Sequence, residues 1–257
     1  MSRRNGTARA GRPSTGPGMV QDLGTGAGGE VEPAGTQAQR ARWRARWAAV
    51  AAVVAALVWL AVDLFGPRST SLRSFDPIEV ARLESAMWRS YYDNDRLRLF
   101  NQLAELMRMQ FRLPFVRSHV VAYHAARAAF TFKNGRGRED YEKALPNLVS
   151  YYSAIRQVGD VPFDVNRAAR LELEWWIIHR ERTRYPAGAL DRALAELAAE
   201  VYAAPADSLM DHGRLRAEAM TVRDTQAEAG GVTETNWTQI EHLLRASWQS
   251  LWEVLNA

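Results

Sequence analysis

The sequence predicts an all-α protein with a single transmembrane helix followed by about eight helices in four antiparallel pairs, as a helical-hairpin array or an irregular bundle. Three observations predict this class. Residues 48–62 form an unbroken apolar run, AAVAAVVAALVWLAV. From Ser74 onward, apolar residues recur at spacings of three and four. No run of alternating β-branched residues competes with that pattern.

The apolar run has the length of a membrane span. With Trp47 before it and residues 63–65 after it, a helix rising about 1.5 Å per residue nearly matches a hydrocarbon core of about 30 Å. A cleaved signal peptide would have a short basic region and an immediate cleavage site, whereas about 40 residues precede this run. A buried core helix would rarely be flanked by arginines and tryptophans. We therefore expect a signal anchor that contacts the lipid bilayer through residues 47–65.

Basic residues predict the orientation of the anchor. Only Arg68 and Arg73 follow the run closely, and Asp76 and Glu79 come soon after them. The segment RARWRAR and the next residue precede the run and supply Arg40, Arg42, Arg44, Arg46 and Trp47. The positive-inside rule then places the N-terminus in the cytoplasm and the folded part outside, as expected of a single-pass protein of the cell (inner) membrane.

Composition divides the chain into four segments. Residues 1–39 hold nine of the 17 glycines and almost no large apolar side chains, which is typical of a disordered cytoplasmic tail. A transmembrane anchor with its basic flank follows at 40–66, and a linker at 67–75. The remainder, 76–257, is expected to be a helical extracytoplasmic domain.

Charge and cysteine content exclude several classes. The chain has no cysteine, which excludes disulfides and thiolate chemistry and is ordinary for an exported bacterial domain. Its net charge of +4 comes from the arginines before the span, so the remainder is close to neutral or slightly acidic. We therefore expect no nucleic-acid partner. No phosphate-binding loop, HExxH, GxSxG or EF-hand pattern is present.

Proline, glycine and capping residues set the expected helix limits. Asp76 before Pro77 is a natural N-cap, Pro146 should kink or delay a helix, and Thr233 to Thr235 supply further capping side chains. The four expected pairs are 77–92 with 96–112, 115–132 with 139–158, 164–185 with 188–203, and 207–229 with 235–255.

A weak repeat of about 49 residues links two of these pairs. Ala144, Leu145 and Leu148 recur at that offset as Ala193, Leu194 and Leu197. The segment AYHAARAAF followed by DYEKALPNL resembles a tetratricopeptide-type motif in this one hairpin, without that family's Trp and Gly positions. The resemblance implies stacked helical hairpins, and a closed irregular bundle of the same helices is the alternative.

Charged residues on apolar helical faces are the candidate site, and they have two interpretations. The first is a buried ion-pair network, because an ionised group inside a protein needs a partner. Its members would be Glu84, Arg127, Glu172, Arg223 and Asp224. The second is a site for iron, manganese or zinc with oxygen and nitrogen ligands. Its ligands would be Glu84, Glu172, His179, His212 and Asp224. The Glu-x-x-His spacing of di-iron bundles is missing.

Aromatic residues are numerous on the same helices. They either belong to the core or line a pocket for a flat ligand. The residues concerned are Trp88, Tyr91, Tyr92, Trp175, Trp176, Trp248 and Trp252.

An anchor, a repeat-like helical array and no catalytic motif predict a scaffold or accessory subunit that binds another protein at the membrane. The alternative is a metal- or small-ligand-binding helical-bundle enzyme that uses buried carboxylates and a histidine. The sequence identifies no cofactor and no catalytic residue.

Overall fold

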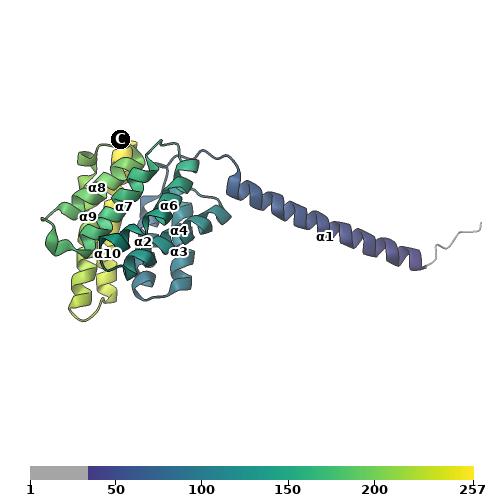
Figure 1. Cartoon of the computed structure of the whole chain (residues 1–257), viewed down its shortest axis with the longest axis horizontal. Coiled ribbons are helices and arrows are strands. Elements are labelled where there is room, and N and C mark those ends of the chain that lie inside the picture. The colour runs from purple at the N-terminus through teal and green to yellow at the C-terminus, as the bar shows by residue number, and fades with distance from the viewer. Residues whose placement is uncertain (1–33) are drawn as a thin grey trace, which may run out of the picture. The chain divides into compact units, whose positions relative to one another are not determined.

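The computed structural model describes residues 34–257, and the chain divides into two compact units, 1–52 and 53–257, which we describe separately (Figure 1). The described residues are helical, with one isolated β-bridge between Thr70 and Gly159, so the all-α prediction is confirmed. Most of the predicted tail, 1–39, lies outside the described residues, and its last six residues begin the first helix.

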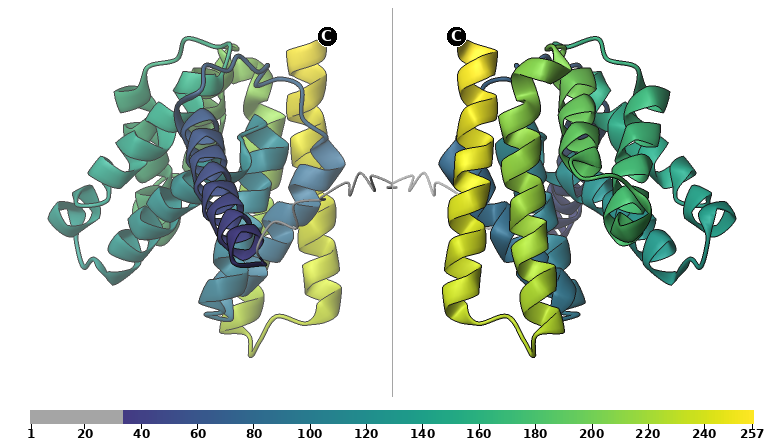
Figure 2. Two further views of the ribbon diagram at one scale, coloured as in Figure 1. Left: turned by 90° about the vertical axis from the view of Figure 1, so that its right-hand side faces the viewer. Right: turned by 90° about the vertical axis from the view of Figure 1, so that its left-hand side faces the viewer.

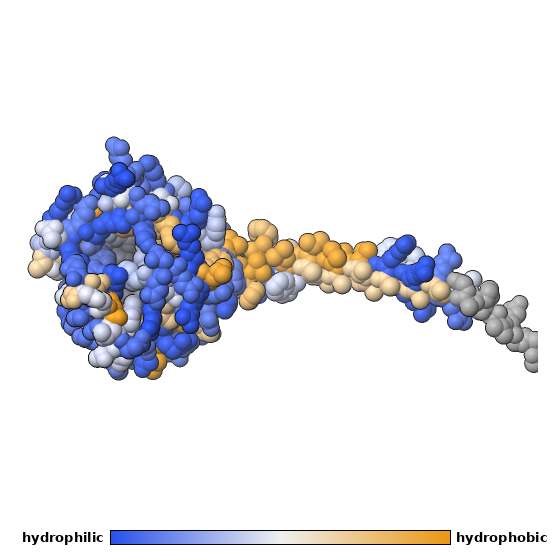
Figure 3. Space-filling view, turned by 90° about the horizontal axis from the view of Figure 1, so that it is seen from below, coloured by the Kyte–Doolittle hydropathy of each residue, from blue (hydrophilic) through white to orange (hydrophobic). Residues whose placement is uncertain are grey.

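Helix α1 (Ala34–Phe65) is the one described helix that is long and apolar enough to span a membrane. Its span, Thr36–Phe65, has a mean hydropathy of 2.4 in its most apolar window, of which only 6% is buried. The helix in the core of a soluble protein would be mostly buried, so this exposure favours a lipid-facing helix over a core helix. Figure 3 shows the apolar side chains of α1 in orange.

The second unit contains a closed ring of eight helices. Each helix packs against the next, and α10 packs against α2, so the ring has no free ends. Figure 2 shows α9 and α10 lying side by side. The ring helices are α2 (Pro77–Tyr92), α3 (Arg96–Phe111), α4 (Phe115–Asn134), α6 (Leu145–Val158), α7 (Val165–Arg180), α8 (Ala189–Tyr202), α9 (Met210–Glu228) and α10 (Glu234–Asn256). The apolar spacing is compatible with an array or a bundle, and ring closure makes this a closed bundle.

Local signals explain where several of the helices begin. The side chain of Asp76 accepts hydrogen bonds from the backbone of Ile78 and Glu79, and Thr233 forms a capping box with Asn236. At the close approach of α8 and α9, a side chain at Gly213 would collide with the carbonyl oxygen of Asp191. The sequence therefore specifies the starts of α2 and α10 and one close helix contact.

Three predicted helices are interrupted in the structure. The helix expected at 139–158 is divided into α5 (Arg138–Glu142) and α6, because Pro146 lies in the first turn of α6. The helix expected at 164–185 ends at Arg180, and the 3-10 turn η1 (Arg182–Arg184) follows it. The segment 207–229 begins as the 3-10 turn η2 (Ala206–Leu209).

Short connections make neighbouring ring helices antiparallel, which gives the ring two distinct ends. The C-termini of α3, α6, α8 and α10 lie at one end, which we call the linker end. The C-termini of α2, α4, α7 and α9 lie at the other end, which we call the mouth. The names refer to these helix termini throughout.

Residues 67–75, predicted to be a linker, pack onto the linker end. Thr70 donates its backbone N–H to the Val158 carbonyl at 2.7 Å, and Arg73 donates to the Tyr202 carbonyl at 3.2 Å. Leu72 is fully buried against Gly159, where a Cβ would lie 2.8 Å from the leucine side chain. This segment satisfies helix C-terminal carbonyls and covers one end of the ring.

The last turn of α1 also contacts the ring helices. Asp63 is buried, and its Oδ1 accepts hydrogen bonds from the backbone N–H groups of Val116 and Arg117, both at 3.0 Å. Asp63 therefore acts as a cap for the N-terminus of α4, which begins at Phe115 without a capping side chain of its own.

Candidate functional site

A cavity of about 540 Å³ lies inside the ring, and all eight ring helices contribute to its wall. This volume falls in the usual range for small-ligand sites. Eleven of the lining residues are aromatic, so the wall is largely apolar and rigid. They are Trp88, Tyr91, Tyr92, Phe111, Phe132, Tyr151, Tyr152, Trp175, Trp176, Tyr202 and Trp248.

The cavity opens at the mouth and is closed at the linker end. Three lining residues at the mouth are exposed to solvent. Lys133 lies in the last turn of α4, Arg180 ends α7, and Arg182 follows α7. At the opposite end, lining residue Tyr202 is buried, and Phe75 of the covering segment packs against its ring at 6.0 Å between centroids. Ligand access is therefore through the mouth.

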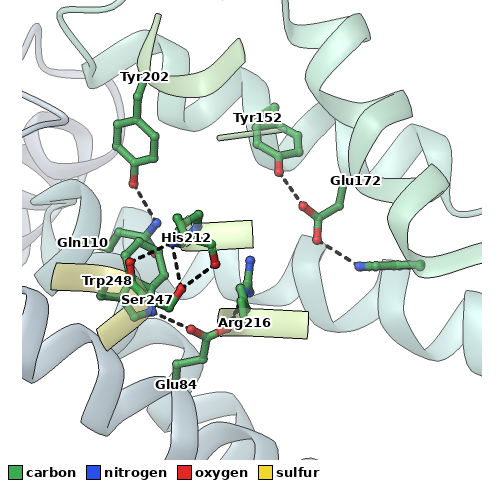
Figure 4. Close-up of polar contacts among 10 residues, drawn as sticks. Glu84, Gln110, Tyr152, Glu172, Tyr202, His212, Arg216, Ser247 and Trp248 are labelled. Atoms are coloured by element: carbon green, nitrogen blue, oxygen red, sulfur yellow. Dashed lines mark hydrogen bonds and ion pairs between the residues drawn. The ribbon is translucent and has the colours of Figure 1, made fainter. Parts of the chain in front are cut away.

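Glu84 on α2 carries the most deeply buried charge on this wall, with 1% of the residue exposed. It forms an ion pair with Arg216 on α9, whose Nε donates to Oε1 at 3.1 Å, and Trp248 donates its indole N–H to Oε2 at 2.6 Å (Figure 4). Burial alone would lower the pKa of Arg216, but the nearby carboxylates of Glu84 and Glu172 outweigh it and raise the pKa. Arg216 therefore stays cationic, and Glu84 is fully engaged.

Glu172 on α7 has a different set of partners. The Tyr152 hydroxyl donates to its Oε2 at 2.7 Å, and the Trp176 indole donates to its Oε1 at 2.9 Å. No cation of the described chain lies within ion-pair distance of this carboxylate. Burial first, and then the charge of Glu172, raises the pKa of Tyr152, which keeps the hydroxyl protonated as a donor. Glu172 therefore faces the cavity held by neutral donors alone.

Among the wall donors without a partner within the described residues, two belong to Trp175 and Arg216. The Nε1 of Trp175 is buried and makes no hydrogen bond. Arg216 uses its Nε and Nη2 for Glu84, which leaves Nη1 without a partner. The guanidinium carbon of Arg216 lies 5.6 Å from the centroid of the Trp175 ring, so the two side chains are neighbours on this wall.

The mouth carries an ion-pair cluster around Asp224. Its carboxylate contacts His179 at 3.0 Å, Arg182 at 2.9 Å and Arg223 at 2.9 Å. Burial would raise the pKa of Asp224, but hydrogen bonds from His179 and Arg223 outweigh it and lower the pKa. Arg180 donates to the Phe132 carbonyl at 2.8 Å and so caps the end of α4. The mouth is thus basic, and its cations already have partners.

The floor at the linker end is a neutral hydrogen-bonded layer. His212 is buried, and its Nδ1 lies 3.0 Å from the carbonyl oxygen of Ser247, to which it donates. Burial lowers the pKa of His212 to about 3. Gln110 donates to the Tyr202 hydroxyl at 3.0 Å in the same layer.

The residues predicted as one ion-pair network separate into different environments. Glu84 and Glu172 line the cavity, and Arg223 and Asp224 pair at the mouth. The expectation that Arg127 is buried is wrong, because it is exposed and lies over the Tyr123 ring, at 5.9 Å from its centroid. Its helix face points outward from the ring.

Arg216 is the cation that sequence reasoning missed. It belongs to a stripe on α9 in which every fourth residue lines the cavity, and this spacing could have identified it. The stripe is His212, Arg216, Met220 and Asp224.

The residues predicted as metal ligands are not gathered into one set. No group of three or more His, Asp or Glu side chains in residues 34–257 is arranged to hold a metal ion. Each predicted ligand has other partners: Arg216 for Glu84, Tyr152 for Glu172, Ser247 for His212. His179 and Asp224 do meet, but two arginines share that carboxylate.

Six of the seven aromatic residues noted in the sequence line the cavity, and Trp252 packs against the outer part of the core instead. Comparisons with protein-family models, with curated proteins and with solved structures found no match to this chain. The candidate site therefore rests on its own geometry.

Proposed function

We propose that this chain is a membrane-anchored binding protein that takes one small, largely apolar organic ligand into the cavity of its helical ring. The observation that carries this proposal is the 540 Å³ cavity, whose wall comes from all eight ring helices. Binding sites are typically concave, mostly apolar and furnished with a few convergent polar groups. Here Glu172, Arg216 and Trp175 are those groups.

The anchoring part of the proposal rests on α1. Its arginine-rich N-terminal flank supports an N-terminus in the cytoplasm and a ring outside, in the inner membrane of a bacterium. In this arrangement the segments 40–66, 67–75 and 76–257 act as anchor, cover of the linker end, and binding ring.

A protein partner at the membrane is a second candidate, and one observation favours it. Met109, Phe115, Val120 and Tyr123 of α3 and α4 are large apolar side chains that are 42% to 56% exposed. Exposed apolar residues that gather on one face are typical of interaction surfaces. Crosslinking of the full chain in membranes, with and without Tyr123→Glu, would test this partner.

The ligand proposal is tested by dye binding to the full chain in lipid nanodiscs. The probe is N-phenyl-1-naphthylamine, an uncharged apolar dye, and energy transfer from tryptophan reports its binding. The variant Ala125→Phe places a ring on the cavity wall, and Ala227→Phe places the same ring on the exposed face of α9 as the matched control.

We expect saturable transfer in the wild type and in Ala227→Phe, and its loss in Ala125→Phe. Dye that dissolves in the lipid contributes equally to all three proteins, so the difference isolates the cavity. Identical transfer in all three would show that the cavity takes no apolar ligand and would overturn the proposal.

A further inference from the structure

The wall of the cavity carries two kinds of unsatisfied group at the same depth. Glu84, Arg216 and Glu172 lie near the middle of their helices, about six or seven residues from the linker end. At about 1.5 Å per residue, this places all three roughly 10 Å above that end. A ligand that enters from the mouth therefore meets these charges together.

The charged groups at this level leave one carboxylate without a cation and one arginine nitrogen without an acceptor. Glu84 and Arg216 neutralise each other, but the Nη1 of Arg216 retains its donors. Glu172 is held only by Tyr152 and Trp176, so its charge has no cation within ion-pair distance among residues 34–257. Glu172 projects from α7 and Arg216 from α9 into one cavity (Figure 4).

Each open position has a definite chemical preference. A carboxylate among aromatic faces favours an ammonium group, which gains both the ion pair and cation–π contact with Trp175 or Trp176. The free guanidinium edge of Arg216 and the unpartnered indole N–H of Trp175 belong to neighbouring side chains, and each of these donors favours a carboxylate. The other wall residues nearby, such as Leu148 and Met107, are apolar.

The cations at the mouth do not compete for the same ligand groups. Arg180 is bonded to carbonyls at the end of α4, and Arg182 pairs with Asp224 and Glu228. Lys133 donates to the side chain of Asn94 at 3.1 Å. These contacts occupy the cations of the rim, so ligand selection falls to the level of Arg216 and Glu172.

We propose that the ligand is a zwitterion with an apolar side group, such as an apolar or aromatic α-amino acid, with its ammonium on Glu172 and its carboxylate between Arg216 and Trp175. This inference rests on the proposed function and specifies its ligand class. The bound ligand supplies a cation to Glu172 and an acceptor to the Trp175 donor.

The test uses four small molecules on one phenyl frame with the full chain in nanodiscs. L-phenylalanine carries both charges, phenethylamine only the ammonium, 3-phenylpropionate only the carboxylate, and 3-phenyl-1-propanol neither. Each is measured directly by isothermal titration calorimetry and also by displacement of N-phenyl-1-naphthylamine. We expect L-phenylalanine to bind best and each single-charge analogue to bind about tenfold or more weakly, because each lacks one charged hydrogen-bonded contact.

Two variants separate the two ends of the ligand. Glu172→Gln should weaken L-phenylalanine and phenethylamine about tenfold and should not weaken 3-phenylpropionate, because an ammonium is attracted by that carboxylate and an anion is repelled by it. Trp175→Phe should weaken L-phenylalanine and 3-phenylpropionate and leave phenethylamine unchanged. Glu174→Gln, on the exposed side of α7, and Trp252→Phe, outside the cavity, are the matched controls.

The outcomes distinguish the two proposals. Dye binding without any preference among the four molecules, or a preference for 3-phenyl-1-propanol, would overturn the zwitterion and leave the binding function standing. Absence of binding by the dye and by all four molecules would overturn both. A far-UV circular dichroism spectrum at the wild-type level shows that each variant is folded, so a change in selectivity then reports on the ligand.

Discussion

The two ends of the ring are built from the same parts and are completed in opposite ways. Each end collects four helix C-termini, whose last carbonyl groups need donors. At the linker end a chain segment supplies them, with the Thr70 N–H bonded to Val158 and Arg73 bonded to Tyr202. At the mouth arginine side chains do so, with Arg180 bonded to Phe132. The covering segment closes the cavity, whereas side chains at a rim leave it open.

This difference separates stability from access. The linker half buries Leu72 and Phe75 of the covering segment, the pair of Glu84 and Arg216, and the floor around His212. The mouth consists mainly of partly exposed ion pairs. We therefore expect mutations in the linker half to lower the free energy of unfolding strongly, and mutations at the mouth to lower it little.

The largest expected effect is that of Glu84→Ala. It leaves Arg216 buried without its partner, which costs about 3 to 5 kcal/mol of the free energy of unfolding. Urea unfolding followed by circular dichroism measures this loss. Glu79→Ala removes a partly exposed pair with Arg82 on the same helix and should cost about 1 kcal/mol or less. Equal effects of the two changes would contradict the burial of the Glu84 pair.

The next effect compares one leucine at each end. Leu72→Ala removes a fully buried side chain of the covering segment and should cost about 2 to 5 kcal/mol. Leu97 begins α3 at the mouth and is 81% exposed, so Leu97→Ala should stay within about 0.5 kcal/mol. The same unfolding experiment measures both. A stable Leu72→Ala variant would show that residues 67–75 do not hold the linker end closed.

The third effect depends on pH. The pKa of His212 is about 3 in the folded protein and its ordinary value is 6.5, so the unfolded chain binds the proton more tightly. Above pH 6.5 the titration of His212 does not reduce the free energy of unfolding. Below pH 6.5 the free energy of unfolding falls by up to about 1.4 kcal/mol per pH unit, until the pH approaches 3. Asp224 at the mouth affects stability in a lower pH range. Its pKa is lowered in the folded protein, so its stabilisation is lost only as the pH falls below the ordinary value of 3.8.

The free energy of unfolding measured at pH 7, 6 and 5 therefore reports on His212 of the floor and not on Asp224 of the mouth. His212→Gln should flatten the dependence over this range, since carboxylates contribute little there. A slope unchanged in His212→Gln would mean that another group is responsible, and the floor histidine would then not be buried as described.

The smallest effect is expected at the rim. Arg180→Ala removes a cap from the end of α4 and a cation 4.3 Å from the Phe132 ring centroid, which costs about 1 kcal/mol or less at this exposed site. Hydrogen–deuterium exchange should show faster exchange confined to the end of α4. Faster exchange throughout the ring would contradict a purely local role for the mouth arginines.

Local rules predicted the helices because the signals are local. Asp76 and Pro77 start α2 as expected, and α10 begins at the predicted capping residues near Thr233. Interruptions near Pro146 and after Arg180 were harder to place, since the chain can continue in short turns that propensities do not separate from helix.

The candidate site was only partly accessible to the same rules. Spacing placed Glu84, Glu172 and most aromatic residues on apolar faces, and these residues do line the cavity. It also selected Arg127, which is exposed, because α4 carries apolar side chains on its outer face as well. Spacing shows which residues share one face of a helix, but the neighbouring helices decide whether that face points into the ring or out of it.

The sequence by itself determined the all-α class, the one apolar helix suited to a membrane and the limits of most helices, because each depends on contacts within a few turns of chain. Only the tertiary structure decided that the ring closes, that residues 67–75 cover one end, and that Glu84 meets Arg216 and Trp248. Those partners lie 132 and 164 residues away in the chain. Which helix faces which neighbour depends on packing of the whole ring at once, and spacing within a single helix carries no information about that choice.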